Sequence, residues 1–107
     1  MNEADFASQV FDLLALYSWH WTHFRPALTN KGWRTPIQGH PGLPDIIAVR
    51  ASPLSVTLPT PQARLLAIEL KSTHGKLTQA EAEWLALFCA AGVETYLWRP
   101  DDPGLEA

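Results

Sequence analysis

The chain has 107 residues, of which 47% are apolar, and its formal net charge is −3 at neutral pH. This length allows one compact domain with one core and excludes a second. The single cysteine, Cys89, excludes an intramolecular disulfide and a cysteine-rich zinc site, and its apolar neighbours predict a small buried helix residue.

The chain begins without a basic leader or an apolar signal core, and no apolar run approaches membrane-spanning length. We therefore expect a soluble intracellular protein that has no membrane partner.

The charges are distributed unevenly. Between Leu13 and Ile68 the only acidic residue is Asp45, and the basic residues of the same stretch are Arg25, Lys31, Arg34, Arg50 and Arg64. From Glu81 onward acidic residues dominate. A basic face beside an acidic remainder is compatible with DNA docking, although a solvated surface of mixed sign explains the same pattern.

The first predicted element is an amphipathic helix from about Glu3 to Tyr17. Its apolar face at helical spacing consists of Phe6, Val10, Leu13, Leu14 and Tyr17. Glu3 falls on the edge of that face, so its side chain is expected near the core. Alternating aromatic residues from Trp19 to Phe24 then predict a strand that ends at Pro26. Tryptophans at alternating positions either pack in the core or stack on unpaired bases, and we favour the core for at least one of them.

The segment from Ala27 to Pro41 is rich in glycine, proline and basic residues, and it predicts a loop that contacts a substrate. Two apolar runs follow, Asp45–Val49 and Leu65–Lys71, and they predict a pair of strands. Between them, the prolines of residues 51–62 predict a loop or loose hairpin.

Thr78-Gln79-Ala80-Glu81 is a capping-box sequence and predicts a helix to about Ala91. Its predicted buried side consists of Trp84, Leu87, Phe88 and Ala91. Residues 93–98 predict a last strand, and residues 101–107 an acidic, weakly ordered tail. The element order αβββαβ requires a crossover before the last strand, so we expect an α/β fold with a mixed central sheet flanked by helices.

Three charged residues stand in the two apolar strands. Glu69 and Lys71 are two positions apart and therefore point to one face of their strand. If the two strands pair, Asp45 joins them in a cluster that suits a divalent cation and a positioned lysine. Buried charges are normally paired or bound to metal, so a salt bridge without catalysis explains the same residues.

Several motifs occur together in a fixed order. They are Gly42-Leu43-Pro44-Asp45, Glu69-Leu70-Lys71, Gly75-Lys76-Leu77-Thr78 and Trp84-Leu85. In this order and strand context, residues 1–100 resemble the VRR-NUC domain, the virus-type replication-repair nuclease branch of the PD-(D/E)XK superfamily. The basic and aromatic segment before Asp45 is also similar to that of small phage-type members. The resemblance implies a restriction-endonuclease-like core.

The resemblance further implies a metal-dependent DNA endonuclease. Asp45 and Glu69 would bind Mg²⁺ or Mn²⁺, and Lys71 would orient the attacking water or stabilise the developing charge. Glu3 matches the acid that the superfamily often places on its first helix, although an acid there also stabilises the helix dipole. Cleavage of branched, junction or flap DNA by a homodimer is expected, in the cytoplasm of a bacterial or phage-infected cell, during replication, recombination or repair.

The chain departs from the family pattern at one position. Related domains usually have a glutamine three residues before the Trp-Leu pair, where this chain has Glu81, with Gln79 two residues earlier. Either residue takes the role, or the role is lost. The residues proposed to contact DNA are His23, Arg25, Lys31, Arg34 and Lys76. A nucleic-acid-binding module with little cleavage and a purely structural domain remain the alternatives.

Overall fold

Helix α1 (Glu3–Leu16) begins where the sequence predicts, because Asn2 caps it. The Asn2 Oδ1 atom accepts a hydrogen bond from the Asp5 N–H at 2.8 Å, which satisfies one of the free amides of the first turn. The computed structural model describes residues 2–24, 27–29, 32–34, 38–51 and 63–102. Phe6, Val10 and Leu14 are buried as predicted, whereas Glu3 is exposed rather than near the core.

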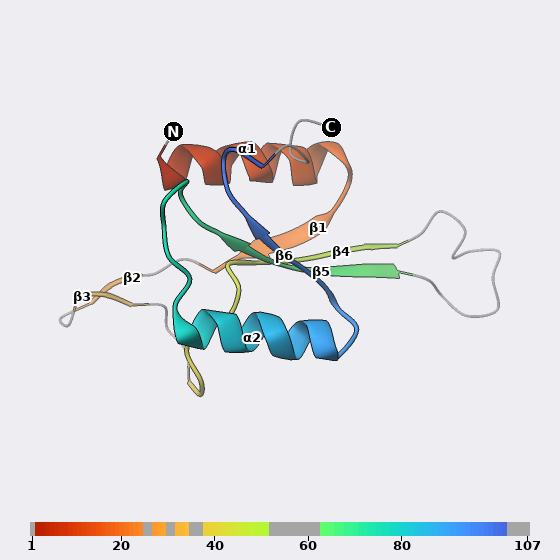
Figure 1. Cartoon of the computed structure of the whole chain (residues 1–107). Helices are drawn as coiled ribbons and strands as arrows, with labels where there is room; N and C mark the ends of the chain where they lie inside the picture. The colour runs from red at the N-terminus through yellow and green to blue at the C-terminus, as the bar shows by residue number, and fades with distance from the viewer. Residues whose placement is uncertain (1, 25–26, 30–31, 35–37, 52–62, 103–107) are drawn as a thin grey trace.

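A four-stranded mixed sheet follows α1 and forms the centre of the fold (Figure 1). Its strands are β1 (His20–His23), β4 (Ile46–Ala51), β5 (Ala63–Leu70) and β6 (Glu94–Trp98), in the order β1-β4-β5-β6. The pairs β1–β4 and β4–β5 are antiparallel, and β6 lies parallel to β5. Helix α2 (Gln79–Ala90) makes the crossover that this parallel pair requires.

The segment predicted as one loop contains two further strands. β2 (Ala27–Thr29) and β3 (Gly32–Arg34) pair antiparallel as a separate two-stranded sheet, with Leu28 opposite Trp33. The αβββαβ order was therefore incomplete, because two three-residue strands are too short for sequence periodicity to reveal. The α/β fold with a mixed sheet and a helix on each side is confirmed.

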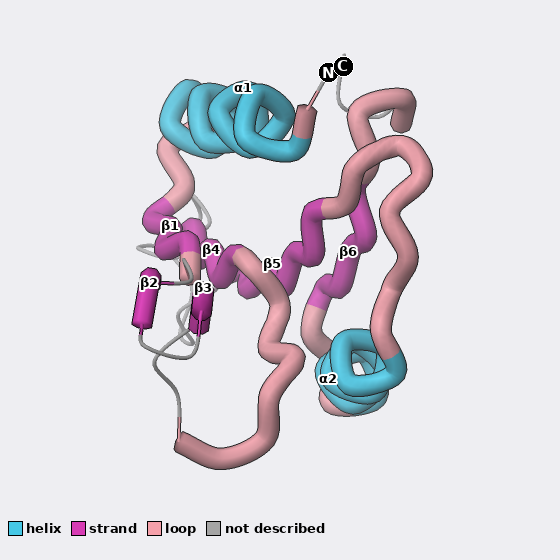
Figure 2. The backbone as a smooth tube through the Cα atoms, turned by 90° about the vertical axis from the view of Figure 1, so that its left-hand side faces the viewer, coloured by secondary structure: helices cyan, strands magenta, loops and turns pink. Residues whose placement is uncertain are grey.

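The two helices lie on opposite sides of the sheet (Figures 1 and 2). Residues Ile46 and Ala48 of β4 and Leu66, Ile68 and Leu70 of β5 pack with α1 in one core cluster. Side chains alternate along a strand, so Ile47, Ala67 and Glu69 point toward the α2 side. We call the two surfaces of the sheet the α1 face and the α2 face.

Helix α2 has the predicted capping box, in which Thr78 and Glu81 each accept a hydrogen bond from the other's backbone N–H. Two of the four residues predicted for its buried side, Leu87 and Ala91, are exposed. Trp84, Leu85 and Phe88 are half-buried, whereas Leu87 is 67% exposed. Cys89 is also exposed, which contradicts its predicted burial. The helix covers the sheet only over β5 and β6, and among its described residues none is fully buried.

Two predicted segments lie outside the described residues: the Pro-rich connection 52–62 and the tail from residue 103. Of the tail predicted over residues 101–107, Asp101 and Asp102 are described, and Asp102 Oδ2 accepts a hydrogen bond from the Arg99 N–H at 2.8 Å. Within the described ranges, neither helix combines the length and apolar character needed to cross a membrane.

Candidate active site

Asp45 and Glu69 face each other across the β4–β5 pair. The antiparallel register places Ile46 opposite Ile68, and one further step along each strand brings Asp45 opposite Glu69. Ile46 and Ile68 belong to the core on the α1 face, so the two carboxyl groups point to the α2 face. Two stretches far apart in the sequence therefore converge as predicted.

The Asp45 carboxylate accepts a backbone hydrogen bond from β5 just beyond the last backbone pair between β4 and β5. Its Oδ2 atom accepts a hydrogen bond from the Leu70 N–H at 2.9 Å. On the other side, the Phe24 N–H donates to the Asp45 carbonyl at 2.8 Å. These two contacts fix Asp45 between β1 and β5, so its carboxylate is positioned by the sheet rather than by a loop.

Glu69 is only 1% exposed, the most buried charged residue of the described core. Its Oε2 atom has no hydrogen-bond partner among the described residues. Burial, followed by the hydrogen bond and charge of Asp45 and by the charge of Glu81, raises the pKa of Glu69 to about 10, while Lys71 opposes the shift. A buried carboxyl oxygen without a donor is costly unless a proton or a cation accompanies it.

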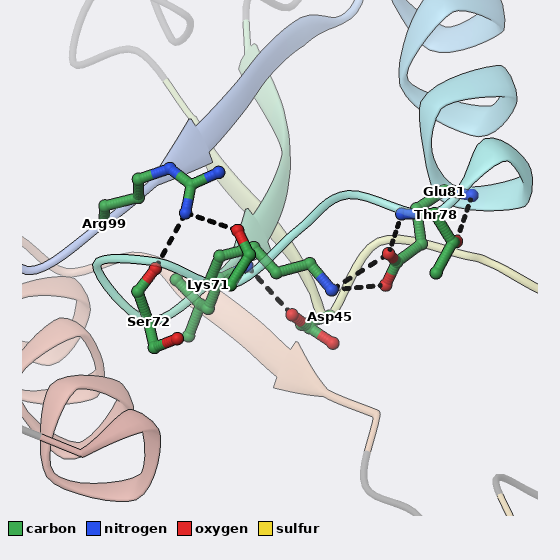
Figure 3. Close-up of polar contacts among 8 residues, drawn as sticks. Asp45, Lys71, Ser72, Thr78, Glu81 and Arg99 are labelled. Carbon is green, nitrogen blue, oxygen red and sulfur yellow. Dashed lines mark hydrogen bonds and ion pairs between the residues drawn. The ribbon is translucent and has the colours of Figure 1, made fainter.

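Lys71 extends from the end of β5 toward the first turn of α2 (Figure 3). Its Nζ atom lies 2.9 Å from Glu81 Oε1 and 3.0 Å from Oε2. Burial opposes the charge of Lys71, but the hydrogen bond and charge of Glu81 outweigh it and raise the Lys71 pKa. Lys71 therefore stays protonated at neutral pH, as a donor and a positive charge.

Glu81 holds Lys71 and caps α2 with the same carboxylate. Its Oε1 atom accepts the Thr78 N–H at 2.8 Å, and its own N–H donates to Thr78 Oγ1 at 3.1 Å. Gln79, the other candidate for the family glutamine, donates instead to Glu83 at 3.3 Å. Of these two residues, Glu81 is the one that the fold brings to the site.

Arg99 fixes the turn that follows Lys71, and sequence reasoning did not identify it. Its Nη1 atom donates to the Ser72 carbonyl oxygen at 2.8 Å (Figure 3). The same atom donates to the carbonyl oxygens of Thr73 at 3.4 Å and Gly75 at 2.7 Å. The backbone of this turn has no neighbouring strand to pair with, so hydrogen bonds from the guanidinium satisfy its carbonyl oxygens instead. The only sequence signal was a basic residue directly after a strand.

The segment before Asp45 is anchored on α2. Gly42 has φ +98°, and a Cβ atom there would lie 2.7 Å from the Ala80 carbonyl carbon, so only glycine fits. The Trp84 indole N–H donates to the Pro41 carbonyl at 2.9 Å. These contacts explain why glycine and tryptophan belong to the motif pattern.

The remaining predicted residues lie elsewhere or outside the described part. Glu3, in the first turn of α1, makes no hydrogen bond or ion pair with Asp45 or Glu69 within the described ranges. His23 pairs with Ile46 and lies on the α1 face, with its ring 4.9 Å from that of Phe11. Lys76 is exposed in the loop before α2. Arg25 and Lys31, and the side chain of Arg34, fall outside what the structure describes.

The donor set fits a hard divalent cation. Within the described ranges, no three histidine, cysteine or acidic side chains are grouped closely enough to hold a metal on their own. Mg²⁺ needs fewer, since it usually keeps several waters and takes one or two carboxylates together with substrate phosphate oxygens. Asp45 and Glu69 would supply two carboxyl groups, and Glu69 Oε2 is a buried carboxyl oxygen that no donor of the described residues satisfies.

Comparison of the chain with known protein families, with curated proteins and with solved structures finds no match. The geometry of the site must therefore support any function by itself.

Proposed function

We propose that this protein is a metal-dependent DNA endonuclease of the VRR-NUC type, in which Asp45 and Glu69 hold Mg²⁺ or Mn²⁺ and Lys71 is the catalytic cation. The observation that carries the proposal is the unpartnered oxygen of Glu69, buried opposite Asp45. A structural salt bridge leaves that oxygen unexplained, because Lys71 is paired with Glu81 rather than with Glu69.

The charge of the cluster supports a cationic ligand. Three carboxyl groups, from Asp45, Glu69 and Glu81, interact electrostatically with the single ammonium of Lys71. Without a further cation, Glu69 compensates by retaining its proton, as its raised pKa indicates. A bound divalent ion would offset the excess negative charge and would supply a more acidic bound water.

Each residue has a separate task in hydrolysis of a phosphodiester. Asp45 is held by the Leu70 N–H, so its position does not depend on substrate. Lys71 is charged and donates hydrogen bonds, which suits stabilisation of the negative charge that builds on the scissile phosphate. Proton abstraction by Lys71 would require a neutral amine, which Glu81 disfavours. Glu81 holds the Lys71 side chain in place through their ion pair. Few side chains at this site could read the edges of DNA bases.

Cleavage assays test this proposal directly. Purified protein is incubated with junction, flap and plain duplex DNA in Mg²⁺, in Mn²⁺ and in EDTA. We expect metal-dependent nicking that Asp45→Ala and Lys71→Ala reduce by about 100-fold or more. Equal cleavage by wild type and both variants would exclude this site.

A second readout tests the metal without relying on activity. The melting temperature of the wild type should rise on addition of Mn²⁺, because a ligand that binds only the folded state stabilises it. Asp45→Asn should abolish the rise, whereas Glu83→Gln, an exposed change on α2, should keep it. DNA binding that needs no metal and yields no product would instead indicate a binding module with this fold.

A further inference from the structure

A cavity of about 420 Å³ opens on the α1 face, on the side of the sheet opposite Asp45 and Glu69. It lies between the C-terminal half of α1 and the strands β4, β5 and β6. Its walls combine aromatic rings with two arginines: Tyr17, Trp19, Arg50, Arg64, Tyr96 and Trp98. This size falls in the range of small-molecule sites, and the cleavage reaction makes no use of these residues.

The two arginines differ in their partners. Arg64 forms a bidentate ion pair with Glu94, with distances of 2.7 and 2.8 Å. Arg50 donates one hydrogen bond, to the Tyr17 carbonyl at 3.1 Å, and its guanidinium lies 4.5 Å from the centre of the Trp19 ring. In the part of the chain that is described, no carboxylate forms an ion pair with Arg50. A guanidinium has five N–H donors, so Arg50 retains donors for an anion.

The local charge is positive. Two guanidinium groups face one carboxylate, that of Glu94, whose pKa is lowered mainly by the hydrogen bond with Arg64 and to a smaller extent by the charge of Arg50. The C-terminus of α1 faces Arg50 through the Tyr17 carbonyl and offsets part of its charge. An anion that contacts Arg50 gains a charge-assisted, bidentate partner held against an aromatic ring.

The aromatic wall determines the rest of the ligand. Tyr96 and Trp98 stack on each other with ring centroids 5.5 Å apart, and the guanidinium groups of both arginines lie over the Trp19 ring, 4.5 and 5.3 Å from its centre. Tyr17 and Tyr96 are 49% and 37% exposed, so their rings are accessible to a ligand. Flat aromatic groups such as nucleobases stack on these surfaces without sequence preference.

We propose that this cavity binds a nucleoside monophosphate, either free or as the end of a DNA single strand, with its phosphate on Arg50 and its base against the aromatic wall. The site is separate from the Asp45–Glu69 cluster and does not depend on cleavage at that cluster. A nucleotide site on the α1 face would also explain the two arginines there, Arg50 of β4 and Arg64 of β5, which the Asp45–Glu69 cluster on the α2 face does not use.

Calorimetric titration in EDTA, with deoxyadenosine 5′-monophosphate as the probe, tests this proposal. We expect binding that is about tenfold weaker for deoxyadenosine and for inorganic phosphate, since each lacks one half of the recognition. Comparison of 5′-phosphorylated and 5′-hydroxyl oligodeoxyadenylate distinguishes the two sources. A strand end that binds more tightly than the free nucleotide indicates strand capture, and weaker binding indicates a free-nucleotide site.

Two variants with opposite expected effects separate recognition from folding. Arg50→Gln should weaken binding about tenfold, whereas Glu94→Gln removes the competing carboxylate and should strengthen it severalfold. Misfolding cannot produce the second result, and Arg50→Lys, which keeps the charge, should retain part of the affinity. Asp45→Ala should bind the nucleotide as the wild type does. Absence of binding, no response to Arg50→Gln and Glu94→Gln, or loss of binding in Asp45→Ala would overturn the proposal.

Discussion

The Lys71 ammonium lies within 3.0 Å of both carboxylate oxygens of Glu81, across the junction between β5 and α2. Glu81 in turn is fixed by its capping hydrogen bonds with Thr78. The lysine of the candidate site is therefore oriented by the helix that follows it in the sequence.

Glu81→Gln should separate the capping role from the orientation of Lys71. The amide oxygen can still accept the Thr78 N–H, but the part-buried Lys71 loses its ionised partner, so we expect the free energy of unfolding to fall by about 1.5–3 kcal/mol at neutral pH. Cleavage should fall by about tenfold or more, because Lys71 loses the partner that positions it. Glu83→Gln makes the same chemical change at an exposed site of α2 and should alter neither quantity.

The wild type and Glu81→Gln should also differ in how the free energy of unfolding changes at acidic pH. Burial raises the pKa of Glu81, but hydrogen bonds from Thr78 and the interaction with Lys71 outweigh it and lower the pKa overall. A depressed folded-state pKa gives stability that is present above the ordinary glutamate value of 4.5 and is lost as pH falls through the lowered value. Chemical denaturation below pH 4.5 should therefore narrow the gap between wild type and Glu81→Gln. A gap that widens on acidification would contradict the assignment.

Sequence reasoning identified most of the sheet because its signals are local. The apolar runs of β4 and β5, the capping box at Thr78 and the aromatic alternation of β1 each depend on neighbours in the chain. The strands β2 and β3 were missed because three residues carry no measurable period. In α2, Leu87 and Ala91 were wrongly assigned to the buried side, because helical periodicity identifies an apolar face but not how much of that face the sheet covers.

The candidate site was predictable to the extent that strand register follows from pattern. Asp45 and Glu69 were expected to meet, and the antiparallel pairing brings them together. The choice between Gln79 and Glu81 required the helix to be placed in space, because both lie in the same turn. The contacts of Arg99 were beyond sequence reasoning, since its three carbonyl partners lie 24 to 27 residues earlier in the chain.

Glu69 should make the protein less stable at alkaline pH when no metal is present. Its folded-state pKa of about 10 exceeds the ordinary value of 4.5, chiefly because of burial. The folded state therefore binds the proton more tightly than the unfolded chain, and stability declines as pH rises from 4.5 toward 10. Glu69→Gln removes this decline, so in EDTA at pH 8 we expect the variant to be more stable by about 2 kcal/mol.

Metal should reverse that ranking. A bound Mn²⁺ or Mg²⁺ would favour the ionised Glu69 and stabilise the wild type, whereas the amide of Glu69→Gln would be a poorer ligand. Thermal melts at pH 6 and pH 8, with and without metal, measure both effects. If wild type and variant show the same pH dependence in EDTA, the Glu69 carboxyl is not held protonated by burial.

Arg99→Gln should loosen the turn from Ser72 to Gly75. Loss of the hydrogen bonds from the guanidinium leaves carbonyl oxygens of that turn without a partner, so we expect a decrease of about 1.5–3 kcal/mol in the free energy of unfolding. Arg99→Lys, with a smaller donor group, should recover only part of it. Urea denaturation measures the change, and Arg64→Gln is the matched control.

Arg64 forms an ion pair that is half exposed, and its removal should cost at most about 1 kcal/mol. In Arg99→Gln, DNA cleavage should fall together with stability, because the turn that Arg99 holds begins directly after Lys71. Equal stability losses for Arg99→Gln and Arg64→Gln would show that the carbonyl contacts add nothing beyond a surface charge.

Gly42→Ala should be destabilising for two separable reasons, a positive φ and a close approach. The backbone at Gly42 has φ +98°, and an added Cβ would lie 2.9 Å from the Ala80 Cβ and 2.7 Å from its carbonyl carbon. Gly39 supplies the control, since its φ is +113° but a Cβ added there would meet no atom of the described residues within 4 Å. Gly39→Ala should cost about 1 kcal/mol from backbone strain alone.

Gly42→Ala should cost about 1–3 kcal/mol more than that control, because α2 must shift to admit the methyl group. A shift of α2 displaces Glu81 and with it Lys71, so cleavage should fall in Gly42→Ala and stay unchanged in Gly39→Ala. Chemical denaturation of both variants measures the two stability losses, and nicking assays measure the two changes in cleavage. Equal costs would mean that the segment before Asp45 does not press against α2, and the expected coupling between this segment and Lys71 would be wrong.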